Sequence, residues 1–332
     1  MRKILLLFTG GTIASIKTER GLEPVLNAEQ IMSYLPEISE DIHLGSRQIC
    51  NLDSTDIEYH HWLEMAAAIE ENYERYDGYV ICHGTDTMAY TAAALSYLIQ
   101  NSIKPIILTG SQQPIQMEIT DAKKNLYDSI VYAADEESSG VNIIFDGKVI
   151  AGTRAKKTMS FSYRAFSSIN FPEIASMQHG KIVRYIASDA REDTTRFYHA
   201  MNPRVFTLKI TPGMAPAILR TIFETYDGII VESFGVGGMP GSMIEDFRQL
   251  MKEYEQHPKV IVMTTQVTYE GSNLSTYEVG ERIKGCFPYL EAYDMNSEAV
   301  LTKLMWILGQ ENMDYHKIET LFYRRINHDV LI

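Results

Sequence analysis

Short runs of apolar, mostly branched residues alternate along this chain with longer stretches of helical period, and this alternation constrains the fold most strongly. Apolar runs of this length are typical of buried strands, and strands that alternate with helices form a mostly parallel sheet. We therefore predict an α/β fold. The predicted strands are Ile4–Phe8, Tyr79–Cys82, Ile106–Leu108, Asn142–Phe145, Val205–Ile210, Ile229–Val231 and Val260–Met263.

The stretches between these strands carry apolar residues at spacings of three and four, which place them on one face of a helix. We expect each such face to be buried. The predicted stripes are Trp62, Ala66, Ile69 and Tyr73; Met88, Ala92, Leu95 and Ile99; Ile218, Ile222 and Tyr226; and Phe247, Leu250, Met251 and Tyr254.

A chain of 332 residues has room for about two domains. The segment Ser188–Arg196 is charged and contains no aliphatic side chain larger than that of alanine, as is typical of a linker. We predict an N-terminal domain over residues 1–187, a linker over residues 188–204 and a C-terminal α/β domain over residues 205–332.

Charge and cysteine content argue against several classes of protein. The net charge is −13, and no basic run is longer than Lys156-Lys157, so we expect no nucleic-acid partner. No stretch approaches the roughly 18 apolar residues of a membrane span, and the first apolar run is too short for a signal peptide. The three cysteines lie far apart, which favours neither a disulfide framework nor a zinc site. We expect a cytoplasmic protein.

Ligands of parallel α/β sheets bind beyond the carboxyl ends of the strands, so the residues that follow each strand are the candidates. Thr9-Gly10-Gly11-Thr12 follows the first strand, where the glycines allow a tight turn that presents a hydroxyl. A phosphate-binding loop is not favoured, because the G-x-G-x-x-G spacing is absent. A simple helix cap by Thr12 remains an alternative.

His83-Gly84-Thr85-Asp86-Thr87 follows the second predicted strand. Thr85 or Asp86 could cap the next helix, or the pair could place a hydroxyl and a carboxylate in the same crevice as Thr12. His83 is interpreted as a hydrogen-bonded core histidine, since no second histidine lies nearby at the spacing of a metal site.

Two further segments leave their alternatives open. Asn51–Asp56 resembles an ordinary helix N-cap, but it could equally bind a zwitterion through a carboxylate and hydroxyl groups. The paired Lys156 and Lys157 could lie on the surface, or a desolvated lysine there could take a proton from a threonine hydroxyl.

Taken together, the blocks Thr9–Ala14 and His83–Tyr90 resemble those of the bacterial-type L-asparaginases. The resemblance extends over nearly the whole chain. The block Gly110–Pro114, together with an N-terminus interpreted as a strand, is similar to the cytoplasmic type I branch. Further matching residues are Asp53-Ser54-Thr55, Thr109-Gly110-Ser111-Gln112, Arg154–Lys157 with Ala165-Phe166, and Phe234-Gly235-Val236-Gly237.

The resemblance implies a larger N-terminal α/β domain, a smaller C-terminal α/β domain, mostly parallel sheets, and a homodimer or homotetramer in which two chains complete each site. It also implies hydrolysis of L-asparagine to L-aspartate and ammonia, with no metal or organic cofactor. Thr12 matches the nucleophile that forms an acyl-enzyme. A second catalytic set would consist of Thr85, Asp86 and Lys157. The substrate's α-ammonium and α-carboxylate would be bound by Asp53, Ser54, Thr55, Thr85 and Asp86.

One departure from the family pattern concerns activation of Thr12. The family usually presents a tyrosine about ten residues after the nucleophile, whereas this chain has Leu22 at the matching position. We therefore consider a hypothesis in which Glu23 takes over the role of the tyrosine hydroxyl.

Two other functions remain as alternatives. A non-catalytic sensor could bind asparagine in the same pocket and report it through an oligomer. The asparaginase-like component of the archaeal complex that amidates glutamate on transfer RNA shares the motif, but it carries a further domain ahead of it, whereas the motif here begins at Thr9. We expect the hydrolase instead.

Overall fold

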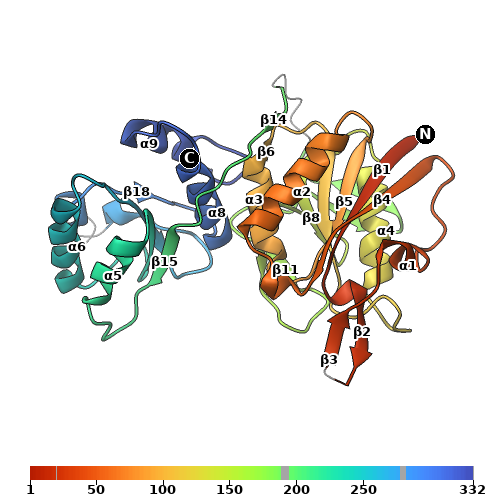
Figure 1. Cartoon of the computed structure of the whole chain (residues 1–332), viewed down its shortest axis with the longest axis horizontal. Coiled ribbons are helices and arrows are strands. Elements are labelled where there is room, and N and C mark those ends of the chain that lie inside the picture. Colours follow the sequence, from red (N-terminus) through yellow and green to blue (C-terminus); the bar gives the residue numbers. More distant parts are fainter. Residues whose placement is uncertain (20, 188–193, 277–281, 332) are drawn as a thin grey trace. The chain divides into compact units, whose positions relative to one another are not determined.

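The computed structural model describes residues 1–19, 21–187, 194–276 and 282–331. They form two compact units, Met1–His199 and Ala200–Ile332, which are described separately (Figure 1). The predicted segment Ser188–Arg196 falls partly outside the described residues, because residues 188–193 do. The limits 188–204 for a linker therefore stay a prediction.

The first unit is built on an eight-stranded sheet with the order β13-β12-β9-β8-β7-β5-β1-β4. Neighbouring strands from β4 to β8 are parallel, whereas β9, β12 and β13 pair antiparallel. This confirms the predicted α/β fold and its strands. The bounds are β1 (Arg2–Gly10), β4 (Ile42–Leu52), β5 (Gly78–Cys82), β7 (Pro105–Thr109), β8 (Gly140–Phe145), β9 (Lys148–Ala151), β12 (Ala175–Gln178) and β13 (Lys181–Arg184).

Successive residues of a strand point to opposite faces of the sheet, and strands such as β5 and β7 are buried at every position. Both faces of the sheet are therefore apolar and are covered by helices. Ile4, Leu6 and Phe8 of β1 share one core with residues of α1 and α4. The helix α3 packs on β7 and β8 and also contacts α2. The helices are α1 (Ala28–Met32), α2 (Tyr59–Asn72), α3 (Met88–Leu98) and α4 (Ala122–Ala133).

Smaller elements complete the first unit. The strand pairs are β2 (Ser15–Thr18) with β3 (Gly21–Pro24), β10 (Ala155–Lys157) with β11 (Phe166–Ser168), and β6 (Ile99–Gln100) with β14 (Arg196–Phe197). The last pair shows that residues 196–197, predicted as part of the linker, form a strand of the first unit.

The second unit contains a four-stranded, fully parallel sheet, which is smaller than the first, as predicted. Its strands are β15 (Val205–Lys209), β16 (Gly228–Ser233), β17 (Val260–Thr265) and β18 (Leu290–Glu291). The helices described in this unit are α5 (Ile218–Thr225), α6 (Gly241–Glu253), α8 (Ser297–Leu308) and α9 (Tyr315–Tyr323).

The predicted helix stripes were wrong in two places. In α5 the buried residues are Leu219, Ile222 and Phe223, while Ile218 is 43% exposed. The face of α5 that packs on the core is therefore rotated by about one residue from the predicted face. In α3 nearly every residue is buried rather than one stripe, since the helix is covered on all sides.

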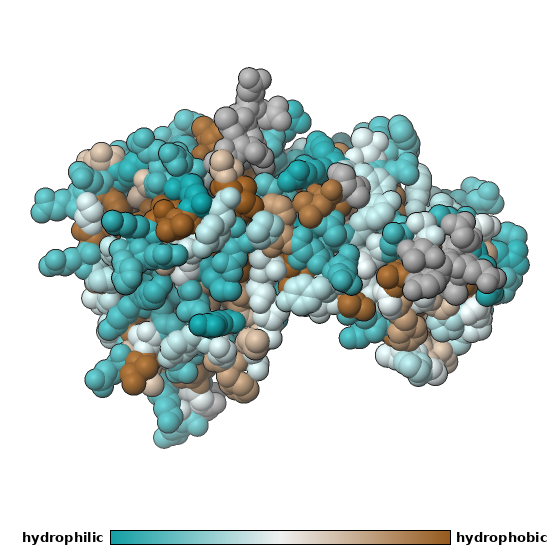
Figure 2. All heavy atoms as spheres, turned by 180° about the vertical axis from the view of Figure 1, so that it is seen from behind, coloured by the Kyte–Doolittle hydropathy of each residue, from teal (hydrophilic) through white to brown (hydrophobic). Residues whose placement is uncertain are grey.

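Among the described helices, none is both long and apolar enough to cross a membrane. Figure 2 shows that hydrophilic side chains cover most of the visible face, with apolar side chains in separate small patches. Scattered apolar side chains of this kind are normal on a protein surface.

A buried ion pair fixes the last residues of the second unit. Lys303 of α8 and Asp329 are both fully buried, and Lys303 Nζ donates to Asp329 Oδ2 at 2.6 Å. The same Nζ donates to the Arg324 carbonyl at 2.9 Å, and Asp329 Oδ1 accepts from the Ile326 N–H at 2.9 Å. Burial lowers the pKa of Lys303, and the adjacent Asp329 carboxylate opposes that shift.

We expect Lys303→Met to lower the free energy of unfolding by about 3–5 kcal/mol at pH 7, because it removes the cation that forms an ion pair with the buried Asp329 carboxylate. Urea unfolding followed by circular dichroism measures this change. Lys252→Met, on the exposed side of α6, is the control and should change stability by less than about 0.5 kcal/mol. Equal effects of the two substitutions would contradict the prediction.

Candidate active site

The turn after β1 lies directly against the turn after β5. Gly10 and Gly11 have φ values of +102° and +77°, which favour glycine. A Cβ on Gly11 would stand 2.3 Å from Gly84 Cα, and a Cβ on Gly84 would stand 2.6 Å from Ser54 Oγ. Neither glycine can therefore carry a side chain without displacing its neighbour.

Thr12 follows this contact by one residue. It begins a short 3-10 helix, Thr12–Ala14, and is half-buried. Within the described chain, no hydrogen bond joins its hydroxyl to Thr85, Asp86 or Lys157. Thr12 nevertheless lies at the same edge of the sheet as Thr85, because the turns after β1 and β5 are in contact there.

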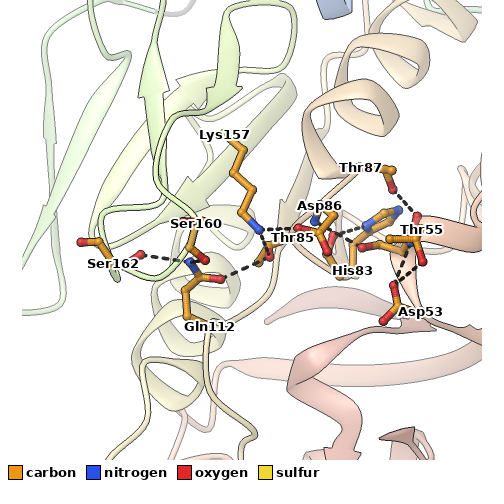
Figure 3. Close-up of polar contacts among 12 residues, drawn as sticks. Asp53, Thr55, His83, Thr85, Asp86, Thr87, Gln112, Lys157, Ser160 and Ser162 are labelled. Carbon is orange, nitrogen blue, oxygen red and sulfur yellow. Dashed lines mark hydrogen bonds and ion pairs between the residues drawn. The ribbon is translucent and has the colours of Figure 1, made fainter. Parts of the chain in front are cut away.

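Lys157 joins Thr85 and Asp86 directly (Figure 3). Its Nζ donates to Thr85 Oγ1 at 2.8 Å and to Asp86 Oδ1 at 2.6 Å. The Lys157 side chain is 17% exposed and the Asp86 side chain 56% exposed. A cation therefore lies beside a buried hydroxyl, while part of the paired carboxylate stays open to solvent.

Lys157 reaches Thr85 by a route that the sequence pattern did not indicate. The strand β9 is antiparallel to β8, so its last residue, Ala151, pairs with Asn142 near the start of β8. The chain then turns back along α3 as β10. Because side chains alternate along a strand, Lys157 and Lys156 point to opposite sides of β10, and Lys157 is the one at Thr85.

The predicted zwitterion-binding segment forms a second 3-10 helix, Ser54–Asp56, which Asp53 caps. Asp53 Oδ1 accepts from the Thr55 N–H at 2.9 Å and from Thr55 Oγ1 at 2.8 Å. Ser54 Oγ accepts from the Asp86 N–H at 3.2 Å. Asp53 therefore caps this short 3-10 helix, whereas Glu58 is the N-cap residue of α2, so the expected N-cap of the long helix was wrong. The binding of a zwitterion by this segment stays a prediction, and Ser54 connects the segment to Asp86.

Gln112 also contacts Thr85, although it was not predicted as a site residue. Thr85 Oγ1 donates to Gln112 Oε1 at 3.3 Å (Figure 3). Gln112 follows β7, the neighbour of β5 in the sheet. The rule that sites lie beyond the ends of parallel strands could have identified it.

Comparison with known proteins identifies the family. A model of the asparaginase N-terminal domain matches residues 3–191, and a model of the glutaminase/asparaginase C-terminal domain matches residues 204–322. The chain belongs to the asparaginase family.

Relatives of the chain agree with this family. It is 39% identical over 330 residues to an L-asparaginase of Thermococcus kodakarensis, covering 98% of each chain. The structure of that organism's thermostable L-asparaginase has a TM-score of 0.91 at 37% identity, covering 99% of each chain. Escherichia coli K12 L-asparaginase 1 is 30% identical, covering 93% of each chain. A component of the glutamyl-tRNA(Gln) amidotransferase of Pyrococcus furiosus is 32% identical, covering 93% of this chain and 72% of that one.

The departure from the asparaginase pattern at Leu22 lies on β3. This strand contacts the Thr12–Ala14 helix, and Leu22 is 49% exposed. Glu23 follows Leu22 in the strand, so the two side chains point to opposite faces of the hairpin. This geometry argues against Glu23 as a direct replacement for a side chain at position 22.

His83 is a core residue of this asparaginase-family site, as predicted. The Gly84 carbonyl can only accept, so His83 Nδ1 carries the proton in that 2.7 Å hydrogen bond. His83 Nε2 then accepts from Thr91 Oγ1 at 3.0 Å, and Thr91 Oγ1 accepts from Trp62 Nε1 at 2.9 Å. Burial lowers the pKa of His83 to about 4, so the imidazole is neutral at pH 7.

We expect His83 to make stability pH-dependent. The ordinary pKa of 6.5 applies to the unfolded chain, and the value of about 4 applies to the folded chain. Between these values the unfolded chain binds more protons, so the free energy of unfolding falls as pH drops through this window, by up to about 3 kcal/mol.

Urea unfolding of the wild type and of His83→Gln at pH 7 and pH 5 tests this dependence. The variant should lose less stability between the two values than the wild type does. His60→Gln, which replaces an exposed histidine, should keep the wild-type difference. A His83→Gln protein with the full wild-type loss would show that another group is responsible.

Proposed function

We propose that this chain is an amidohydrolase that converts L-asparagine and water to L-aspartate and ammonia through a threonine acyl-enzyme intermediate. The observation that carries the proposal is the Lys157–Thr85–Asp86 cluster beside the Gly11–Gly84 contact, where Thr12 also lies. Membership of the asparaginase family, and relatives named L-asparaginase, support the substrate class.

In the first step, Thr12 Oγ attacks the side-chain carbonyl carbon of asparagine. The bond between that carbon and nitrogen breaks, the leaving nitrogen takes the hydroxyl proton and departs as ammonia, and the aspartyl group remains on Thr12 as an ester. An amide is a poor electrophile, so this step needs an activated nucleophile and donors for the developing oxyanion.

In the second step, water attacks the ester carbonyl, releases L-aspartate and restores the Thr12 hydroxyl. The Lys157 cation, 2.8 Å from Thr85 Oγ1, lowers the cost of negative charge on the Thr85 oxygen or on a water bound to it. Asp86 holds Lys157 in place through the 2.6 Å ion pair. In this scheme Thr12, Thr85, Asp86 and Lys157 are the catalytic residues.

Substrate binding uses the polar cluster around Asp53. Lys157 occupies one oxygen of the Asp86 carboxylate, which is more than half exposed, so a substrate ammonium can approach it. Thr85, Asp53, Ser54 and Thr55 complete the set for the α-ammonium and α-carboxylate. We further propose a cytoplasmic homodimer or homotetramer in which a second chain completes each site.

Two alternatives predict different outcomes in the same assay. A sensor would bind asparagine without releasing ammonia. The match to the glutamyl-tRNA(Gln) amidotransferase component favours, as a second candidate function, a role in amidating glutamate on transfer RNA. In that role the amide nitrogen would be transferred to glutamate on transfer RNA instead of being released as free ammonia.

We expect the purified wild-type protein alone to release ammonia from L-asparagine. Steady-state ammonia release from L-asparagine and from L-glutamine measures the activity and the preference. One methylene shifts discrimination by only about 1–3 kcal/mol, so some release from glutamine is compatible with the proposal. Saturable binding of asparagine in calorimetry without ammonia release would favour the sensor.

We expect Thr12→Ala to abolish ammonia release and leave the fold intact, because the half-buried Thr12 hydroxyl contributes no hydrogen bond to the other described site residues. Thr12→Ser, which keeps a hydroxyl, is the matched variant and should retain measurable release. Circular dichroism checks folding of both proteins. Wild-type rates in Thr12→Ala would assign the nucleophile to Thr85 instead.

A further inference from the structure

The Gln112 side chain connects Thr85 to the loop that follows Lys157. Its Nε2 donates to the carbonyls of Ser160 and Ser162, each at 3.1 Å, while its Oε1 accepts from Thr85 Oγ1 at 3.3 Å. Figure 3 shows the Gln112 amide between the loop and Thr85. Both amide hydrogens and the amide oxygen are thus in use.

The two carbonyls fix the orientation of the amide. A carbonyl oxygen only accepts, so the amide nitrogen must face Ser160 and Ser162 and the amide oxygen must face Thr85. The Thr85 hydroxyl has one hydrogen, and Lys157 Nζ is itself a donor to the same oxygen. The Thr85 hydrogen therefore points to Gln112, and a lone pair of the Thr85 oxygen accepts from Lys157 Nζ.

The backbone of Gln112 is held independently of this amide. Its N–H lies 2.9 Å from Asp121 Oδ2, and the Gln113 N–H lies 3.0 Å from Asp121 Oδ1. Asp121 is buried and also accepts from Asn125 Nδ2 at 3.2 Å. The amide thus extends from a turn anchored to α4, so the position of the Gln112 backbone does not depend on the loop.

Among the described residues, the other hydrogen bonds of this loop lie at its stem or within it, such as those from the Met159 N–H to the Ala165 carbonyl and from the Arg164 N–H to Ser162 Oγ, each at 3.2 Å. Its stem is closed by the Thr158 N–H, which donates to the Ala165 carbonyl at 2.8 Å. Phe161 is 91% exposed and Met159 52% exposed. The ion pair of Arg164 with Asp146 is 3.6 Å long and exposed, so it contributes little.

We propose that Gln112 is a positioning residue, which holds the Thr85 hydroxyl as an acceptor toward Lys157 and at the same time tethers the 158–165 loop beside Lys157. The proposal rests on the proposed hydrolase function for its kinetic consequence. The tether to Ser160 and Ser162 does not, and it can be measured without any substrate.

The test compares Gln112→Met, Gln112→Glu and the control Gln113→Met. Methionine keeps the length of the side chain but neither donates nor accepts strongly. Glutamate keeps an acceptor for Thr85 and, while ionised, cannot donate to the loop carbonyls. Gln113 lies on the same turn, and its side chain makes no hydrogen bond to the described residues, so its substitution reports general disturbance of the turn.

The first measurement is the rate of chymotrypsin cleavage after Phe161 in the native proteins. We expect faster cleavage in Gln112→Met and, at pH 8, in Gln112→Glu, with a wild-type rate in Gln113→Met. At pH 5 the glutamate is partly protonated and can again donate to one carbonyl. The ratio of the Gln112→Glu cleavage rate to the wild-type rate should therefore be smaller at pH 5 than at pH 8. A role in general stability would not produce this pH dependence.

The second measurement is steady-state ammonia release from L-asparagine. Misplacing a group near the reacting atoms can cost as much as about 100-fold in rate. We expect Gln112→Met to lower kcat at least ten-fold with a smaller change in KM, and Gln112→Glu at pH 8 to retain more of kcat than Gln112→Met.

Two outcomes would overturn the proposal. One is wild-type kcat and wild-type cleavage in Gln112→Met, and the other is an equal change in Gln112→Met and Gln113→Met. If Gln112→Met does not fold, Gln112→Glu decides both measurements. If the wild type releases no ammonia, the proposed function fails, while the cleavage rates still decide whether Gln112 holds the loop.

Discussion

The candidate site depends on the close approach of two backbones at Gly11 and Gly84. The strands β1 and β5 are neighbours in register, with Phe8 opposite Cys82, so the turns that follow them meet at one edge of the sheet. Side chains on either glycine would separate these turns. The contact keeps Thr12 and Thr85 on adjacent turns, and the His83–Gly84 hydrogen bond holds the second turn from behind.

A second constraint brings the positive charge to this edge. The residues after parallel strands supply hydroxyl and carboxylate groups, whereas Lys157 arrives on β10 because β9 reverses the direction of the chain. The Lys157 side chain is mostly buried, and burial of a charge is costly unless it is paired. Asp86 provides that pair, and the proposed function gives the same carboxylate a second role in binding the substrate ammonium.

Most of the fold could be predicted from the sequence because buried parallel strands have continuous apolar runs, as in Ile4–Phe8 and Val260–Met263. The edge strand β4 could not, since no residue of Ile42–Leu52 is buried, polar residues interrupt its apolar ones, and only one side of it pairs within the sheet. The direction of β9 was also beyond the sequence, because an apolar run such as Val149–Ala151 looks the same in either direction.

The candidate site, like the fold, could be predicted from the sequence only in part. Local pattern located Thr12 and Thr85 after strands but left simple helix caps as alternatives, and the resemblance to asparaginases was needed to select among them. Contacts that depend on tertiary packing were beyond both arguments. Gln112 follows β7 in sequence, yet the positioning role proposed for it depends on an amide whose nitrogen faces the loop carbonyls and whose oxygen faces the Thr85 hydroxyl. The orientation of this amide is determined by contacts among three segments that meet only in the folded chain, namely the turns that carry Thr85 and Gln112 and the 158–165 loop. The spacing of residue types along the sequence therefore cannot predict it.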